Sequence, residues 1–315
     1  HKEQTMKNIP IIIDTDPGVD DFIAIMLANS CDKLDIRALT AVAGNQTLEK
    51  TVKNSLNIAE LLKMDTRIAK GAEKPLNIDL MVADHVHGDS GLGPVVLKDS
   101  LRELDKDYAW DVIYQEAIKA EGKLQIIAIG PLTNIAIALM KYADLYKHID
   151  KIVIMGGSTG IGNVRPYSEF TIWADPFAAD VVFKSGVPIT MVGLNVTMET
   201  VLTPELVNEI KAVDSKLSKE MSQLLSHMAN TYKGFGYDFV AVHDALAVAC
   251  VIDPKLLEYK DYYVTIETRS SLNSGRTVVD LDRSHRDKKL NASVAIKGDI
   301  DKFVEMLKNM MRYYQ

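Results

Sequence analysis

The feature of this sequence best suited to chemistry is a group of four carboxylates within eight residues. They follow the apolar run Ile11–Ile13 and stand at Asp14, Asp16, Asp20 and Asp21. Crowded like charges cost free energy unless a cation or shared protons relieve them. Carboxylate oxygens are the ligands that hard divalent cations prefer. The cluster therefore predicts a divalent cation at the end of a buried strand.

The same stretch has a simpler interpretation as an ordinary strand–turn–helix unit. Pro17 and Gly18 break the strand, and acids are favoured in a first helical turn by free N–H groups and the helix dipole. Capping explains Asp20 or Asp21 alone. It does not explain Asp14 and Asp16 at the mouth of an apolar strand, so the cation site remains the favoured interpretation.

A second acidic position lies far away in the sequence, at His243-Asp244 in front of the apolar helix Ala245–Val251. A helix cap by Asp244 beside a packed His243 would account for the pair on its own. Combined with the first cluster, a distant carboxylate could complete an oxygen shell of about six to eight ligands. His243 would then be the nearby group able to carry a proton near neutral pH.

Bulk properties exclude several classes of protein. The 315 residues are 47% hydrophobic and 25% charged, which is typical of a soluble globular chain. A net charge of −7 without a long basic cluster argues against binding to nucleic acid. No apolar run reaches about 18 residues, which argues against a membrane span, and the N-terminus does not resemble a signal peptide.

The two cysteines, Cys31 and Cys250, form neither a disulfide framework nor a zinc spacing, which favours a reducing, cytoplasmic setting. We expect His1–Thr5, ahead of Met6, to be an added segment. A single domain is then expected over residues 6–315, because no linker or repeat interrupts it.

Short apolar runs alternate with helical periods along the chain. The predicted strands are Ile9–Asp16, Asp35–Val42, Leu124–Ile129, Lys151–Met155 and Pro188–Val192. The predicted helices include Leu48–Leu62, Ala109–Ala120, Thr133–Met140 and Pro176–Lys184. This rhythm predicts an α/β fold with a mainly parallel open sheet and helices on both faces. Sites in such sheets lie beyond the carboxyl ends of the strands.

The remaining segments depart from this rhythm. Leu76–Gly93 is predicted to be one long irregular loop of the kind that forms lids or binding loops, with His85 and His87 exposed to solvent. Towards the C-terminus, the sequence predicts helices around Glu205–Tyr232, two strand-like runs at Tyr262–Thr268 and Thr277–Leu281, and a closing helix at Asp299–Met311.

Two enzyme classes share single motifs with this chain. Gly156–Gly162 resembles the dinucleotide loop of short-chain dehydrogenases, but it lies in mid-chain and no Tyr-x-x-x-Lys occurs in the sequence. Asp14-Thr-Asp16 resembles the nucleophile site of haloacid-dehalogenase-type phosphatases. Those enzymes usually carry Thr or Val where this chain has Gly18, and they lack a second acidic pair.

Taken together, the motifs resemble the inosine–uridine-preferring nucleoside hydrolase family. Asp14–Asp21 matches the signature motif of that family almost letter for letter. Other segments match in the same order, from Ile11 to about Met311, namely Val42–Thr47, Gly130–Asn134, Met155–Gly157, Gly162–Asn163, Glu169–Phe170, Asp175–Pro176 and Val242–Asp244.

The resemblance implies a Rossmann-like nucleoside hydrolase fold and a Ca²⁺-dependent enzyme. It would cleave the N-glycosidic bond of purine and/or pyrimidine ribonucleosides to ribose and free base. The implied calcium ligands are Asp16, Asp21, Asp244 and the backbone carbonyl of Ile129. The implied ribose-binding residues are Asp20, Asn45, Asn163, Glu169 and Asp244. The resemblance also implies a homo-oligomer, either a tetramer or a dimer.

By the same resemblance, Asp16 would remove the proton of a Ca²⁺-bound water that attacks C1′. An oxocarbenium-like sugar develops in such a cleavage, and nearby anions stabilise it. His243 would protonate the leaving base as general acid. Asp14 would orient its neighbours without contacting the ion.

Two departures from the family pattern affect substrate binding. Thr171 stands where much of the family has Asn, and its hydroxyl has a shorter reach on the ribose. Pyrimidine-preferring members use a tyrosine upstream of the His-Asp pair and a histidine of the long loop. Tyr232 and Tyr237 both fit the first position, His87 fits the second, and Trp173 offers a stacking face. The sequence determines neither which tyrosine occupies this position nor whether the preferred base is a purine or a pyrimidine.

A hypothesis from a different class is a calcium-bound nucleoside- or ribose-binding protein that has lost turnover. Thr171 is the only residue that favours it. Stoichiometric binding of a natural nucleoside without hydrolysis would distinguish this binding protein from an enzyme.

Overall fold

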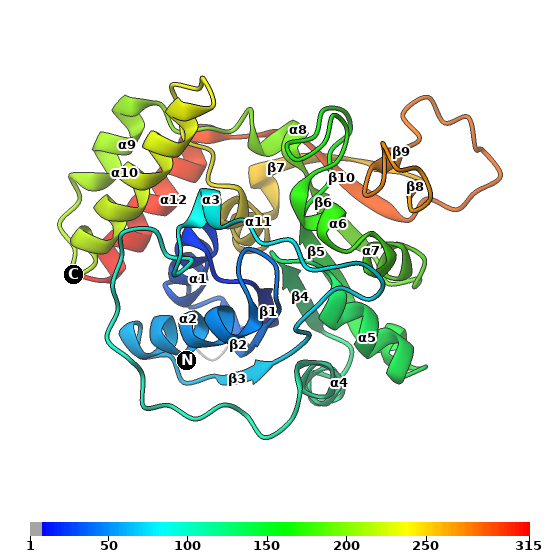
Figure 1. Ribbon diagram of the computed structural model, residues 1–315, viewed down its shortest axis with the longest axis horizontal. Helices are drawn as coiled ribbons and strands as arrows, with labels where there is room; N and C mark the ends of the chain where they lie inside the picture. The colour runs from blue at the N-terminus through cyan, green and yellow to red at the C-terminus, as the bar shows by residue number, and fades with distance from the viewer. Residues whose placement is uncertain (1–7) are drawn as a thin grey trace, which may run out of the picture.

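The computed structural model describes residues 8–315, so the expected added segment at residues 1–5 lies outside it. The core is an eight-stranded sheet with the strand order β3-β2-β1-β4-β5-β6-β10-β7 (Figure 1). Its strands are β1 (Ile9–Thr15), β2 (Leu34–Ala41), β3 (Arg67–Lys70), β4 (Leu124–Ala128), β5 (Ile149–Met155), β6 (Ile189–Val192), β7 (Leu257–Tyr262) and β10 (Ala292–Gly298).

All neighbouring strands are parallel except β10 and β7, which pair antiparallel. Strand β1 is central and buried on both faces, which is why it is continuously apolar. Ile11 and Ile13 point into one hydrophobic core and Ile12 into the other, as the alternation of side chains along a strand requires. The predicted α/β fold with a mainly parallel sheet is confirmed.

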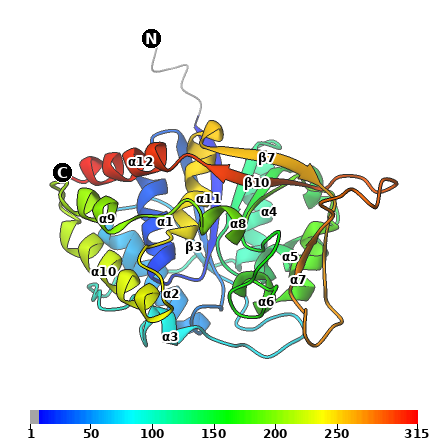
Figure 2. The same ribbon diagram turned by 90° about the horizontal axis from the view of Figure 1, so that it is seen from above.

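Helices cover both faces of the sheet (Figure 2). One face carries α1 (Val19–Asn29), α2 (Leu48–Leu61), α9 (Pro204–Lys211), α10 (Ser218–Gly234), α11 (His243–Ile252) and α12 (Ile300–Tyr313). The other carries α4 (Ala109–Lys119), α5 (Thr133–Lys141) and α7 (Pro176–Phe183). Short helices stand in connecting segments, at α3 (Asp84–His87), α6 (Phe170–Ala174) and α8 (Leu194–Thr197). Within residues 8–315, no helix is long and apolar enough to cross a membrane.

The predicted strands and helices are present with bounds that differ by one or two residues. Strands β3, β7 and β10 were not predicted. Strand β3 begins and ends with a charged residue, and β7 is rich in charged residues. The strand-like runs in the last third form a separate two-stranded sheet, β8 (Val264–Ile266) with β9 (Thr277–Val279). The predicted long loop is also longer, since α3 is the only helix or strand within residues 71–108.

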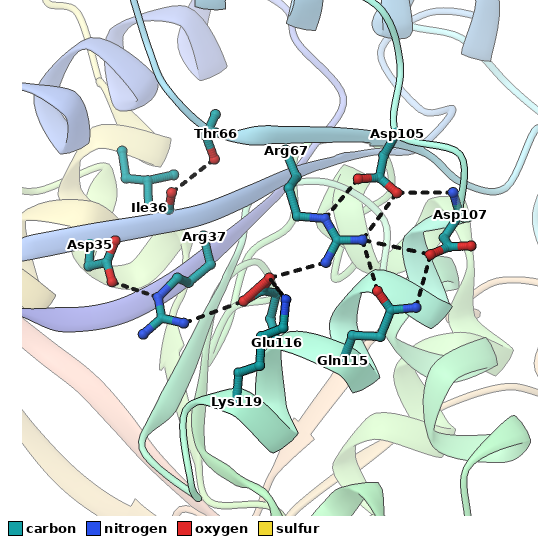
Figure 3. A network of polar contacts seen from close by, with 10 residues as sticks. All are labelled: Asp35, Ile36, Arg37, Thr66, Arg67, Asp105, Asp107, Gln115, Glu116 and Lys119. Atoms are coloured by element: carbon teal, nitrogen blue, oxygen red, sulfur yellow. Dashed lines mark hydrogen bonds and ion pairs between the residues drawn. The ribbon is translucent and has the colours of Figure 1, made fainter.

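A network of charged side chains ties the end of this irregular segment to the edge of the sheet (Figure 3). Arg67 of β3 forms a bidentate pair with Asp105, at 2.7 and 3.1 Å. Its third guanidinium nitrogen contacts Glu116 of α4 at 3.1 Å. Glu116 is 4% exposed and also meets Arg37 and Lys119. Arg67 is therefore the central cation of the network.

We expect Arg67→Met to lower the free energy of unfolding by about 3 kcal/mol, because it removes the nearest cation from a buried carboxylate. Urea unfolding followed by circular dichroism would measure the change, and kcat should stay within about twofold since the network lies away from the acidic cluster. The matched control is Arg312→Met. Arg312 pairs with the exposed Glu305, so this change should cost less than about 1 kcal/mol. Equal losses in the two variants would contradict the prediction.

Candidate active site

The strand order reverses between β1 and β4, and the acidic cluster lies at this switch point. In open α/β sheets, ligands bind beyond the carboxyl ends of the strands at such a point. A cavity of about 910 Å³ opens there. It is lined by all of the predicted site residues except Asp14 and Asp21, namely Asp16, Asp20, Asn45, His87, Ile129, Asn163, Glu169, Thr171, His243 and Asp244.

Asp21 lies beneath the cavity and is held by four donors. It is the third residue of α1, and its Oδ1 accepts the Gly18 N–H at 3.2 Å, as an acid in a capping box does. The Asn45 side chain also donates to Oδ1, at 3.1 Å. Oδ2 accepts the Thr15 hydroxyl at 2.7 Å and the Asp16 N–H at 3.2 Å. These contacts fix the turn between strand and helix.

Asp16 lies at this turn and lines the cavity. Its Oδ2 accepts the Asn45 N–H at 2.7 Å, while its buried Oδ1 has no hydrogen-bond partner within residues 8–315. The backbone packs closely around it, because a Cβ added to Gly44 would lie 2.3 Å from Oδ2. Glycine is therefore needed after β2 to let the chain approach the carboxylate.

Asp20 and Asp244 face each other across the first turns of α1 and α11. Asp20 Oδ2 accepts the Asp244 N–H at 3.3 Å, and the buried Asp20 Oδ1 has no partner within the described chain. The carboxyl groups of Asp16 and Asp244 each lie close enough to Asp21 to share a hydrogen bond with it. The acids that are distant in sequence thus form one cluster.

Burial and mutual repulsion govern the charge of this cluster. Burial, followed by repulsion from Asp21, raises the pKa of Asp16 and of Asp20 well above the usual range of a carboxyl group. The pKa of Asp244 is raised by burial and then by Asp20. The described part of the cavity wall has one cationic side chain, Arg165, which lies over the Trp173 ring with its guanidinium carbon 5.0 Å from the ring centroid. The protein itself thus supplies little positive charge to the acids.

A bound cation fits this arrangement. Among residues 8–315, no three His, Cys, Asp or Glu side chains stand as a ready coordination shell. The acids nevertheless contact one another, and three of their buried oxygens lack partners within the described chain, on Asp14, Asp16 and Asp20. Of these three residues, Asp16 and Asp20 line the cavity. Oxygen donors with excess negative charge select a hard divalent ion. Such an ion would relieve the repulsion among the carboxylates, which is relieved by bound protons when no cation is present.

Asp14 has a different environment from Asp16, although both end β1. Its Oδ2 accepts the Thr40 hydroxyl at 2.6 Å and the Asn134 side chain at 2.9 Å. Burial raises the pKa of Asp14 to about 7, although these hydrogen bonds lower it. Asp14 therefore connects β1, β2 and α5 below the cavity. The contact with Asn134 was not anticipated from the sequence.

The predicted ribose-binding residues lie on the cavity wall, but several are already hydrogen-bonded. Asn45 Nδ2 donates to Asp16 O and to Asp21. Glu169 caps α6, and its carboxylate accepts the backbone N–H groups of Gly157, Thr171 and Ile172. A ribose hydroxyl that bound Glu169 would have to share these acceptor sites.

Asn163 and Thr171 flank that carboxylate. Asn163 is exposed at the mouth of the cavity, and its Oδ1 accepts the Phe170 N–H at 2.9 Å. Thr171 is buried, and its hydroxyl makes a side-chain hydrogen bond with Glu169. The residue that departs from the family pattern thus contacts another predicted ribose-binding residue.

His87 is buried, so the expectation that it would be exposed to solvent is wrong. It ends α3, and its ring packs on Gly18, where an added Cβ would lie 2.3 Å from Nδ1. Nδ1 accepts the Val19 N–H at 3.1 Å, so the ring proton of the neutral imidazole is on Nε2. Burial lowers the pKa of His87 to about 3. His85 is exposed, as predicted.

Gly18→Ala is expected to destabilise the protein by about 1–3 kcal/mol, because the new methyl group collides with the buried His87 ring. Thermal unfolding would measure the effect. Gly234→Ala is the matched control, because a Cβ at Gly234 meets nothing within 4 Å. If both variants unfolded at the wild-type temperature, His87 would not be fixed against Gly18.

His243 begins α11 and lies on the cavity wall, with both ring nitrogens hydrogen-bonded. Nε2 is 2.6 Å from the Tyr232 hydroxyl, and Nδ1 is 2.7 Å from the Thr197 hydroxyl. Tyr232 and Tyr237 both line the cavity, but within the described chain only Tyr232 is hydrogen-bonded to His243. Thr197 was not singled out from the sequence, since no motif surrounds it.

Comparisons with known proteins agree with this geometry. The family model described as "Inosine-uridine preferring nucleoside hydrolase" matches residues 11–305. A pyrimidine-specific ribonucleoside hydrolase RihA from Shewanella sp. strain MR-7 is 40% identical over 309 residues, covering 97% of this chain and 96% of the relative. The RihA protein of Escherichia coli strain SMS-3-5 is 37% identical, covering 97% and 99%.

A solved structure has the same fold throughout. The purine-preferring ribonucleoside hydrolase from Gardnerella vaginalis superimposes with a TM-score of 0.89 at 32% sequence identity. The match covers 96% of this chain and 98% of that protein. The irregular segments and short helices around the cavity therefore lie within the shared fold.

Proposed function

Because the chain belongs to the inosine–uridine preferring nucleoside hydrolase family, and is thus a hydrolase acting on N-glycosyl compounds, we propose that it releases ribose and free base from pyrimidine ribonucleosides. The observation that carries this proposal is the cavity at the switch point, which is lined both by Asp16, with its unpartnered carboxylate oxygen, and by His243. The closer sequence likeness to pyrimidine-specific relatives than to the purine-preferring structure supports the choice of base.

Asp16 acts as the general base. Its Oδ1 has no hydrogen-bond partner within residues 8–315, and its orientation is fixed by the Asn45 N–H, which donates to Oδ2. It removes a proton from the attacking water, whose oxygen bonds to C1′ while the C1′–N bond breaks. Positive charge develops on the sugar, and the buried acids of the cluster stabilise it.

His243, in its protonated form, delivers a proton to the departing base. Burial lowers the pKa of this imidazole to about 4, below the value expected from the sequence, so the protonated ring gives up its proton readily. Without that proton the base would leave as an anion, so its protonation lowers the barrier. The imidazole lies on the wall of the same cavity, next to Asp244 and hydrogen-bonded to Tyr232. The general base, Asp16, and the general acid, His243, thus come from parts of the chain that are distant in sequence.

A divalent cation completes the site, and the family is metal-dependent. We propose calcium, held by Asp16, Asp21, Asp244 and the backbone carbonyl of Ile129. When bound, it would lower the pKa of the attacking water. The carboxylate of Asp21 already accepts four hydrogen bonds, so a cation would share its oxygens with these donors. Asp14 supports the site from below the cavity, where its carboxylate joins β1 to Thr40 of β2 and Asn134 of α5.

The ribose is held by Asp20, Asn45, Asn163, Glu169, Thr171 and Asp244, which line the cavity. His87, which lines the same cavity, contacts the base. Because its Nδ1 accepts the Val19 N–H, it offers only an Nε2–H donor, which suits a carbonyl oxygen of a pyrimidine. The homo-oligomeric state and the cytoplasmic setting stay predictions.

Incubation of the protein with uridine, cytidine and inosine, followed by an assay of free ribose, tests the proposal. We expect release from the pyrimidine nucleosides in the presence of calcium, and slower release from inosine. Absence of ribose from all three would contradict the proposal. Calorimetry on the same samples would then reveal a nucleoside-binding protein, by stoichiometric binding without hydrolysis.

A further inference from the structure

The partners of the His243 ring differ on its two sides. On one side, Nε2 meets the hydroxyl of Tyr232, which lines the cavity. On the other side, Nδ1 meets the hydroxyl of Thr197, which is 1% exposed and does not line the cavity. The imidazole is therefore oriented, with Nε2 towards the cavity and Nδ1 towards the protein interior.

The helix that carries Thr197 is firmly docked. Leu194, the first residue of α8, donates its N–H to Gly157 O at 2.9 Å, and the side chain of Asn195 donates to Ala295 O of β10 at 2.9 Å. The Thr197 N–H closes the helical turn on Gly193 O at 3.0 Å. Threonine also has few accessible χ1 rotamers. Its hydroxyl is thus a fixed point against which the ring can be held.

We propose that Thr197 is a positioning residue for the leaving-group step, holding His243 so that Nε2 serves the base. This inference rests on the proposed function. The reacting ring is the imidazolium, which carries a proton on each nitrogen. The glycosidic C1′–N bond breaks with its electron pair passing to the base, the base takes the Nε2 proton, and the neutral ring keeps its Nδ1–H, which donates to Thr197. The proton that Asp16 took from the water is released to solvent, and the ring regains a proton from solvent before the next turnover.

A hydroxyl suits this task because it both donates and accepts. Thr197 can therefore pair with Nδ1 in either tautomer of the neutral ring. Valine has the same shape but can do neither, and a buried ring nitrogen without a partner costs free energy. The ring of a Thr197→Val variant would turn to find another partner, which would take Nε2 away from the base. At metal sites, the group that binds the second nitrogen of a ligating histidine orients the ring in the same way. Its loss there lowers metal affinity or activity by about 10–100-fold.

Two substrates separate positioning from a general structural defect. Uridine needs a proton on its leaving base, whereas 4-nitrophenyl β-D-ribofuranoside releases a stable phenolate and needs none. We expect Thr197→Val to lower kcat on uridine by about 10–100-fold and kcat on the nitrophenyl riboside by less than about threefold. Thr197→Ser, which keeps the hydroxyl, should restore uridine hydrolysis to within about threefold of wild type. The ratio of the two rates within one sample does not depend on the fraction of folded protein.

Thr200→Val is the matched control. Thr200 is also buried, three residues further along the chain, but its hydroxyl donates to Val196 O and does not contact His243. Its rate ratio should equal that of wild type. Equal losses on both substrates in Thr197→Val, or a serine variant as slow as the valine variant, would overturn the proposal. Failure of the wild-type protein to release ribose from any nucleoside would instead remove the proposed function, and with it the step that Thr197 serves.

Discussion

Replacing Asp16 by asparagine is expected to lower kcat on uridine by about 10²–10⁴-fold, the usual contribution of a general base. The amide has nearly the shape of the carboxylate, and its oxygen can still accept the Asn45 N–H that Asp16 Oδ2 accepts at 2.7 Å. It cannot, however, remove a proton from water. Steady-state kinetics with purified protein would measure the loss.

The Asp16→Asn variant should lose activity without losing stability. In the protein without cation, burial and repulsion from Asp21 destabilise the charged form of Asp16. Asparagine removes that charge, so the variant should unfold at the same temperature as wild type or higher when calcium is absent. Loss of activity without loss of stability would separate catalysis from folding.

Asp14→Asn is the matched comparison, because both acids are buried and end the same strand. Asp14 contacts Thr40 and Asn134 and does not line the cavity, so its loss should cost only about 10-fold, as for groups that orient a reacting residue. An Asp16→Asn enzyme that kept more than a tenth of wild-type kcat would disprove the assignment of the base.

Removal of calcium is expected to abolish activity and to lower stability. A ligand present at about 100 times its Kd stabilises the folded protein by about 2.7 kcal/mol, and chelation removes this amount. The unfolding temperature should fall on addition of a chelator, and calcium should restore both it and kcat. Magnesium should restore less, because it demands a tighter octahedral site. Full activity after exhaustive chelation would contradict the proposed cofactor.

The stabilisation of the folded protein by calcium should depend on pH. The folded pKa values of Asp16, Asp20 and Asp244 are raised above the usual 3.8. Above pH 3.8 the cation-free folded protein therefore binds more protons than the unfolded chain, and its unfolding free energy falls as the pH rises through the raised values. Calcium replaces those protons, so it should stabilise the protein more at pH 8 than at pH 5.

Two variants test whether calcium stabilises the protein through the acidic cluster. Asp244→Asn should abolish the stabilisation by calcium, because it removes a carboxylate of the cluster. Asp150→Asn removes an exposed carboxylate on β5 and should leave the stabilisation unchanged. An Asp244→Asn protein with a wild-type calcium response would exclude Asp244 as a ligand.

Most of the central sheet could be predicted from the sequence. The strands β1, β2, β4, β5 and β6 contribute side chains to both hydrophobic cores, and each therefore keeps apolar residues on both faces, although Asp35 and Arg37 interrupt β2. Strands β3 and β7 carry no long apolar run, because they lie at the edges of the sheet. Their pairing depends on neighbours distant in sequence, which periodicity does not encode.

The sequence by itself also determined most of the candidate site. Polar residues at the ends of apolar strands must gather at one edge of a parallel sheet, so the positions of Asp16 and Asn45 in the chain are enough to place them together. The fold also explains why Asp244, more than two hundred residues away, reaches the same point. Helix α11 packs against α1, and both helices begin at the cavity.

Only the tertiary structure decided how these groups are held. It buried His87 on Gly18, hydrogen-bonded Tyr232 rather than Tyr237 to His243, and placed Thr197 behind the ring. Hydrogen bonds between separate elements depend on helix docking to within a fraction of an ångström, and no local spacing records that docking. The identity of the acids followed from sequence, because their charge requires a partner wherever they lie. The orientation of the histidine required the fold.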